Sequence, residues 1–153
     1  MSGQALCLRL QPIFGGGAAE RGQDLLRGLG GWLKLNGEAI YGTRPWTTYG
    51  EGPTGIPKAF NEEAQSDYTA EDIRFTTKDN VLYAILLGWP GATATVASLM
   101  AGGPLPADRI ESVGMVGVDG DLTWSQDALG LNVHLPQATP CDHAQVLRIT
   151  LKA

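Results

Sequence analysis

Acidic side chains occur in three close pairs, and paired carboxyl groups can act as nucleophile and general acid/base in hydrolysis. The pairs are Glu62-Glu63, Glu71-Asp72, and Asp119 with Asp121. The first lies in a polar run typical of a solvated loop, and the third is a turn signature between two predicted strands. Glu71-Asp72 directly precedes a strand, where turn capping is the expected role. We therefore predict no catalytic pair here.

A second group with chemical potential is Cys141-Asp142-His143. Consecutive residues of a strand point to alternate faces. A catalytic triad instead brings distant positions together, and a zinc site needs three or four ligands. The pattern favours a loop before the final strand, with no metal and no cofactor. Cys7 and Cys141 are predicted to be two free thiols, with a disulfide as the alternative.

Aromatic side chains are a third candidate, because an exposed ring can stack on a sugar. Trp46, Tyr49 and Trp89 are the candidate substrate-binding residues, and Trp124 is a fourth aromatic of the same kind. Packing in or beside the core is the favoured interpretation, since a buried Trp removes ~150–250 Å² from water. No phosphate-binding glycine pattern is present: Gly15-Gly16-Gly17 lacks the accompanying Lys and Ser/Thr.

The composition restricts the fold and the partners. A chain of 153 residues with 43% hydrophobic residues is expected to form one folded domain, with or without a short appendage, and its 21 Gly and 9 Pro favour short strands with frequent turns. The net charge is −5 and no basic run occurs, so neither nucleic acid nor an anionic membrane is an expected partner. No apolar stretch approaches the ~20 residues of a membrane span. No signal peptide is recognised, which leaves the cellular compartment open.

The periodicity predicts one helix followed by β structure. Leu25, Leu29, Trp32 and Leu33 recur at helical spacing within residues 19–36. Three glycines weaken this helix by up to about 1 kcal/mol each, so it is expected to need a packing partner. Residues 1–18 are an unassigned leader.

The remainder predicts an antiparallel β-sandwich of about 7–8 strands. A hairpin with a two-residue turn at Asp79-Asn80 is its clearest element, and residues 45–67 are predicted to form a long ordered loop. The predicted strands are 73–78, 81–87, 94–100, 110–117, 122–126, 131–135 and 145–151.

Several blocks, in order, resemble the α-L-fucosidases of glycoside hydrolase family 29. The resemblance covers roughly residues 20–153. It rests on Gly31–Trp46 (GWLKLNGEAIYGTRPW), Tyr49–Thr54 (YGEGPT), Tyr68–Lys78 (YTAEDIRFTTK), Leu82–Ile85 with Leu87–Pro90, Leu122–Asp127 (LTWSQD) and Gly130–Pro136 (GLNVHLP).

This resemblance implies a catalytic (β/α)8 barrel followed by a C-terminal β-sandwich. Residues 19–36 are then similar to the last barrel helix and residues 37–153 to the sandwich. The resemblance places an Asp nucleophile and a carboxylic acid/base in the barrel, which needs ~200–250 residues by itself. No catalytic residue is therefore carried over.

The resemblance implies two partners, the barrel of the parent enzyme and a fucosylated carbohydrate. We expect the chain alone to be inactive. A free-standing carbohydrate-binding module is the alternative. A truncated gene, a partial gene model and an independent module all stay open.

Overall fold

The computed structural model describes residues 16–54 and 68–153. The chain divides into two compact units, Met1–Lys34 and Leu35–Ala153. We describe each unit by itself. Cys7, the Glu62-Glu63 pair and most of the predicted leader lie outside the described residues.

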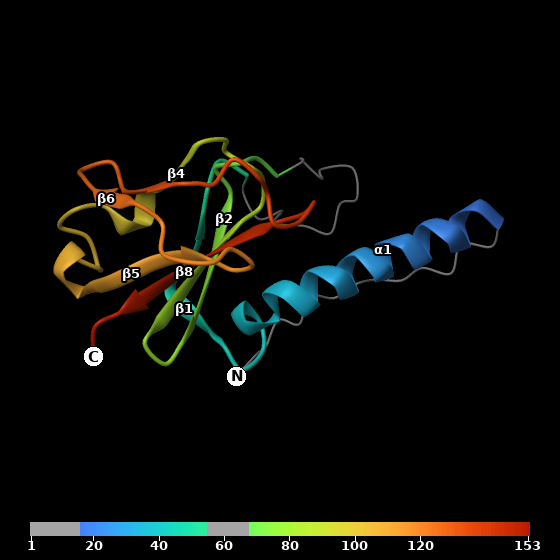
Figure 1. Ribbon diagram of the computed structural model, residues 1–153, viewed down its shortest axis with the longest axis horizontal. Helices are drawn as coiled ribbons and strands as arrows, with labels where there is room; N and C mark the ends of the chain where they lie inside the picture. The colour runs from blue at the N-terminus through green and yellow to red at the C-terminus, as the bar shows by residue number, and fades with distance from the viewer. Residues whose placement is uncertain (1–15, 55–67) are drawn as a thin grey trace. The chain divides into compact units, whose positions relative to one another are not determined.

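Helix α1, Gly16–Asn36, is 21 residues long, and all but its last two residues belong to the first unit (Figure 1). A helix over 19–36 was predicted, so its existence and its end are confirmed. Leu29, Trp32 and Leu33 are partly buried, but Leu25 is 74% exposed. Of the predicted apolar positions, Leu25 is thus exposed and the other three are partly buried. No described helix is long and apolar enough to cross a membrane.

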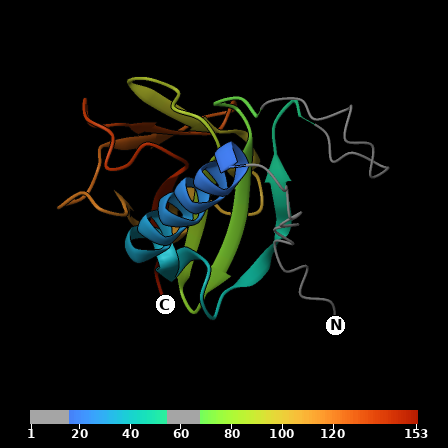
Figure 2. The same cartoon turned by 90° about the vertical axis from the view of Figure 1, so that its right-hand side faces the viewer.

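The second unit is a β-sandwich of two antiparallel sheets, as predicted. The larger sheet has the strand order β1-β2-β3-β8-β5, and the smaller has the order β4-β7-β6. Figure 2 shows β1 at the edge of the larger sheet, next to β2. The strands are β1 (Arg44–Glu51), β2 (Ile73–Lys78), β3 (Val81–Leu86), β4 (Thr93–Val96), β5 (Ile110–Met115), β6 (Trp124–Gln126), β7 (Leu131–His134) and β8 (Gln145–Leu151).

The core lies between the two sheets, because side chains alternate along each strand. In β2, for example, Ile73 and Phe75 are buried while Arg74 and Thr76 are only partly so. The fully buried core side chains include Leu82, Leu86, Val96, Leu99, Val113, Leu131, Val133, Leu147 and Ile149.

The outer face of the larger sheet is covered over β3, which explains the uninterrupted apolar run of that strand. Tyr83 and Ile85 point away from the core and are 4% and 7% exposed. The short helix η1 (Gly37–Ala39) packs over this face. There the Thr76 hydroxyl donates a hydrogen bond to the Ala39 carbonyl oxygen at 2.6 Å. A strand buried on both faces has no polar positions to alternate with.

The β2–β3 hairpin is the best-predicted element. β2 ends at Lys78 and β3 begins at Val81, so the turn is Asp79-Asn80 as predicted. Asp79 has a φ of +52°, a left-handed conformation that Asp adopts more readily than most residues.

The predicted loop over residues 45–67 is wrong in its first part, because β1 occupies Arg44–Glu51. β1 is an edge strand whose register with β2 is interrupted between Pro45 and Gly50. Edge strands tolerate Pro and irregular pairing, because they have a neighbouring strand on one side only. The period-2 signal is therefore missing from the sequence.

The third predicted strand, residues 94–100, is shorter than expected. β4 ends at Val96, and a 3-10 turn, η3 (Ala97–Leu99), replaces the rest of the predicted 94–100 segment. Another 3-10 turn, η4 (Ala107–Arg109), precedes β5.

Candidate functional site

The Asp72 carboxylate is fully buried and accepts four hydrogen bonds. The Thr69 backbone N–H and hydroxyl donate at 2.7 and 3.0 Å. The Thr54 backbone N–H and hydroxyl donate at 3.0 and 2.7 Å. Burial raises the pKa of Asp72, but these hydrogen bonds outweigh it and lower the pKa to about 2. Asp72 is therefore ionised at neutral pH and holds two segments together.

This arrangement confirms the turn-capping role predicted for the Glu71-Asp72 pair in the case of Asp72, and extends it. Thr69 lies three residues before Asp72, which is the local cap, whereas Thr54 lies 18 residues before it. Gly52 makes the approach possible: its φ is +123°, and an added Cβ would lie 2.6 Å from the Asp72 Cα.

A second acidic side chain, Glu51, connects β1 to the start of η3. Its carboxylate accepts hydrogen bonds from the Ala97 N–H at 2.7 Å and the Ser98 N–H at 2.6 Å. These are otherwise unsatisfied donors at a helix N-terminus, where negative charge is favoured. Glu51 therefore has a structural role that sequence reasoning missed, because its partners lie more than 40 residues away.

Cys141-Asp142-His143 forms the loop before the final strand, as predicted. The buried Gln145 amide donates to the Cys141 and His143 carbonyl oxygens at 2.6 and 2.8 Å. Asp142 and His143 are exposed. Among residues 16–54 and 68–153, no three His, Cys, Asp or Glu side chains are grouped so that they could hold a metal ion.

The three predicted sugar-binding aromatics differ in their surroundings. Trp46 packs edge-on against Phe75, with ring centroids 5.4 Å apart and an interplanar angle of 63°. Trp46 and Trp89 are partly buried against the core, as is Trp124. Tyr49 is 60% exposed. No ring contact joins any two of the three predicted residues in the described part of the chain.

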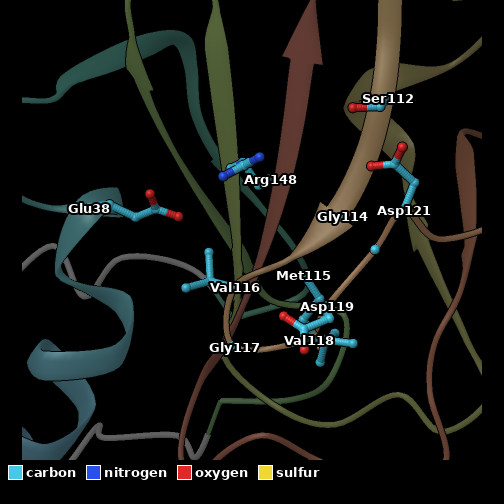
Figure 3. Close-up of a pocket in the computed structure, with 11 residues that line it drawn as sticks. Glu38, Ser112, Gly114, Met115, Val116, Gly117, Val118, Asp119, Asp121 and Arg148 are labelled. Atoms are coloured by element: carbon cyan, nitrogen blue, oxygen red, sulfur yellow. The ribbon is translucent and has the colours of Figure 1, made fainter.

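A cleft of about 310 Å³ lies in the second unit, between η1, β8 and the end of β5 (Figure 3). Its charged lining residues are Glu38, Asp119, Asp121 and Arg148. Asp119 and Asp121 lie in the predicted turn, where Gly120 has a φ of +86°. Sequence reasoning missed this cleft because its walls come from segments that only the sheet pairing brings together.

Comparison with known proteins identifies the lineage. The family model described as "Alpha-L-fucosidase C-terminal domain" matches residues 65–150, more than half of the chain. The chain belongs to the α-L-fucosidase C-terminal domain family. The resemblance noted in the sequence is thereby confirmed, and the chain corresponds to the C-terminal β-sandwich region of such an enzyme.

Full-length relatives are much longer than this fucosidase domain. Rat tissue alpha-L-fucosidase is 34% identical over 119 residues, which is 77% of this chain and 21% of the relative. Human plasma alpha-L-fucosidase is 31% identical over 155 aligned positions, 97% of this chain and 29% of the relative. The chain thus spans between a fifth and a third of these relatives' lengths.

Solved structures show the same fold. The crystal structure of Thermotoga maritima alpha-fucosidase in complex with a mechanism-based inhibitor matches with a TM-score of 0.60 and 27% identity. The match covers 84% of this fucosidase domain and 26% of that enzyme.

Proposed function

We propose that this chain is the non-catalytic accessory domain of an α-L-fucosidase, and that its partner is the catalytic barrel of that enzyme. The single observation that carries the proposal is the coverage: the chain matches 21–29% of its full-length relatives. The parent enzyme would release terminal α-L-fucose from glycoconjugates. The domain itself would support the barrel.

The hydrogen bonds already made by two acidic side chains support an accessory role. The carboxylates of Asp72 and Glu51 are occupied by backbone and hydroxyl donors. Asp72 has a pKa of about 2, far below the near-neutral value that suits a general acid or base. These two residues stabilise the sandwich instead of transferring protons.

Exposed apolar side chains on each of the two units support docking on a barrel. Ile40 and Tyr41, directly after η1, are 41% and 60% exposed. Leu25 and Leu26 on α1 are 74% and 48% exposed. Apolar area removed from water stabilises an interface by about 25 cal/mol per Å². Burying these groups would therefore favour association with the barrel.

Two experiments test the proposal. Purified chain should release no chromophore from a chromogenic fucoside, and release that a carboxylate-pair mutation abolishes would overturn an accessory role. A chimera should also be made in which residues 35–153 replace the matching region of the Thermotoga maritima enzyme. We expect an active, soluble chimera, and a lower thermal midpoint when Ile40 and Tyr41 are both changed to Ser.

Sugar binding through Trp46, Tyr49 and Trp89 is a second proposal, supported by the 60% exposure of Tyr49. The packing of Trp46 and Trp89 against the core leaves less of their rings for a ligand. Calorimetric titration with fucose and fucosylated oligosaccharides tests it. The absence of binding heat at millimolar sugar would contradict this proposal, since even a weak Kd of about 1 mM corresponds to a binding free energy of about 4 kcal/mol.

A further inference from the structure

The cleft between η1, β5 and β8 is built from firmly held backbone. The Val116 N–H donates to the Val146 carbonyl oxygen at 2.9 Å, which joins one wall to β8. The Leu122 N–H donates to the Val113 carbonyl oxygen at 2.7 Å, so the turn that carries Asp121 folds back on β5. A cleft of about 310 Å³ with pinned walls matches the lower end of the ~300–1,000 Å³ range of preformed small-molecule sites.

Arg148 is the cation of this cleft. It lies on β8 and is exposed. Its neighbours in the sheet are Tyr83 on β3 and Gly114 on β5. Gly114, the residue of β5 paired with Arg148, has no side chain to cover the guanidinium. Within residues 16–54 and 68–153, no carboxylate forms an ion pair with Arg148, so its planar set of N–H donors is available to a ligand.

Carboxylates line both sides of the guanidinium. Figure 3 shows Arg148 between Glu38 on η1 and the Asp121 side chain, with Asp119 further along the same turn. All three carboxylates belong to exposed residues. Ser112 adds a hydroxyl to the lining. The cleft therefore offers many acceptors around one donor cluster, together with apolar groups from Val116 and Val118.

We propose that this cleft binds a small, uncharged polyhydroxyl ligand, namely a monosaccharide or the end of an oligosaccharide. Hydroxyl groups both donate and accept, so adjacent hydroxyls can donate to Glu38 or Asp121 and accept from Arg148. An anionic ligand would face three carboxylates, and a purely cationic ligand would leave the N–H donors of Arg148 without an acceptor. Val116, which is 9% exposed, adds a small apolar contact for the C–H face of the sugar ring, whereas Val118 packs against the core. The site goes beyond the accessory role and uses none of the three predicted aromatics.

The test is an NMR titration of the folded chain with L-fucose and, separately, D-glucose as neutral probes. The backbone amides of Gly114, Gly117 and Gly120 report on the cleft, and the indole N–H groups of Trp46 and Trp89 report on the aromatic alternative. We expect saturable, millimolar shifts at the glycine amides. Shifts confined to the two indoles, or no shift at any of these positions with either sugar, would overturn the inference.

Variants make the test specific. Arg148→Gln and Asp121→Asn should each weaken sugar binding about tenfold, the scale of one charge-assisted hydrogen bond lost. Arg109→Gln is the matched control, because Arg109 is an exposed arginine outside the cleft. Unchanged amide spectra away from the cleft show that each variant folds. Equal affinity of Arg148→Gln and the parent chain would contradict the site.

A cationic probe checks the ligand class. Lysine amide should produce no saturable shifts at the glycine amides, and binding of lysine amide without binding of sugar would overturn the proposal. The accessory role is judged separately, by the activity and solubility of the chimera. Failure of sugar binding therefore leaves that result unaffected, and the two proposals can fail independently.

Discussion

Thr54 and Asp72, which are 18 residues apart in the chain, are joined by two hydrogen bonds. The Thr54 backbone N–H donates to Oδ1 of Asp72 at 3.0 Å, and the Thr54 hydroxyl donates to Oδ2 at 2.7 Å. This contact joins the end of the β1 segment to the turn before β2. It brings two of the family-like blocks, Tyr49–Thr54 and Tyr68–Lys78, into one network. The Asp72 carboxylate at its centre is buried and charged, so loss of these hydrogen bonds should destabilise the whole sandwich.

The first prediction concerns the removal of this charge. Asp72→Asn should lower the urea midpoint of the chain, because the amide NH₂ would face the donors of Thr54 or Thr69. Asp142→Asn is the control, since Asp142 is exposed. Equal midpoints for both variants would contradict the structural role of Asp72.

The second prediction is a pH dependence. The pKa of Asp72 is about 2 in the folded chain, against an ordinary value of 3.8. As the pH falls from about 5 to about 2, the unfolded state takes up the proton first, so the stability that Asp72 contributes is present above pH 3.8 and lost below it. Urea unfolding at successive pH values should show this loss, and Asp72→Asn should flatten it. A parallel fall in Asp72→Asn would assign the acid sensitivity to other groups.

The third prediction concerns Glu51. Glu51→Ala should destabilise the chain by about 1 kcal/mol, because it removes the carboxylate that caps Ala97 and Ser98. Glu111→Ala, at an exposed position of β5, is the matched control. Denaturant unfolding measures the stability of both variants. A loss of stability in Glu51→Ala no larger than in the control would contradict a stabilising cap by Glu51.

The fourth prediction separates two kinds of glycine. An added Cβ at Gly30 or Gly31 meets nothing within 4 Å, so Ala at either position should stabilise α1 by up to about 1 kcal/mol. Gly52→Ala should destabilise instead, because the backbone has a φ of +123° and lies against Asp72. Circular dichroism of helix content and thermal midpoints distinguish the two outcomes. A destabilising Gly30→Ala would mean that α1 has a close neighbour in solution.

The fifth prediction is self-association of the isolated chain. Its exposed apolar side chains include Ile40 and Tyr41 after η1, and Leu25 on α1, and exposed apolar patches promote association. Sedimentation should show concentration-dependent oligomers, which replacement of Ile40 and Tyr41 by Ser should reduce. A clean monomer across the concentration range would count against an unpartnered barrel-facing surface.

Local patterns in the sequence determined the β2–β3 hairpin, the final strand Gln145–Leu151 and the helix that ends at Asn36. In these elements the periodicity and the turn residues act within a few positions of one another, so they can be read from the chain directly. The ordered blocks likewise determined the family.

Tertiary structure alone decided the rest. β1 is a strand because β2 pairs with it, despite Pro45 and a broken register. The partners of Asp72 and Glu51, and the placing of Arg148 among the carboxylates of the cleft, arise from contacts between segments 18 to more than 100 residues apart. Such contacts depend on how strands pair and which residues each sheet face covers, and no local spacing in the sequence encodes that.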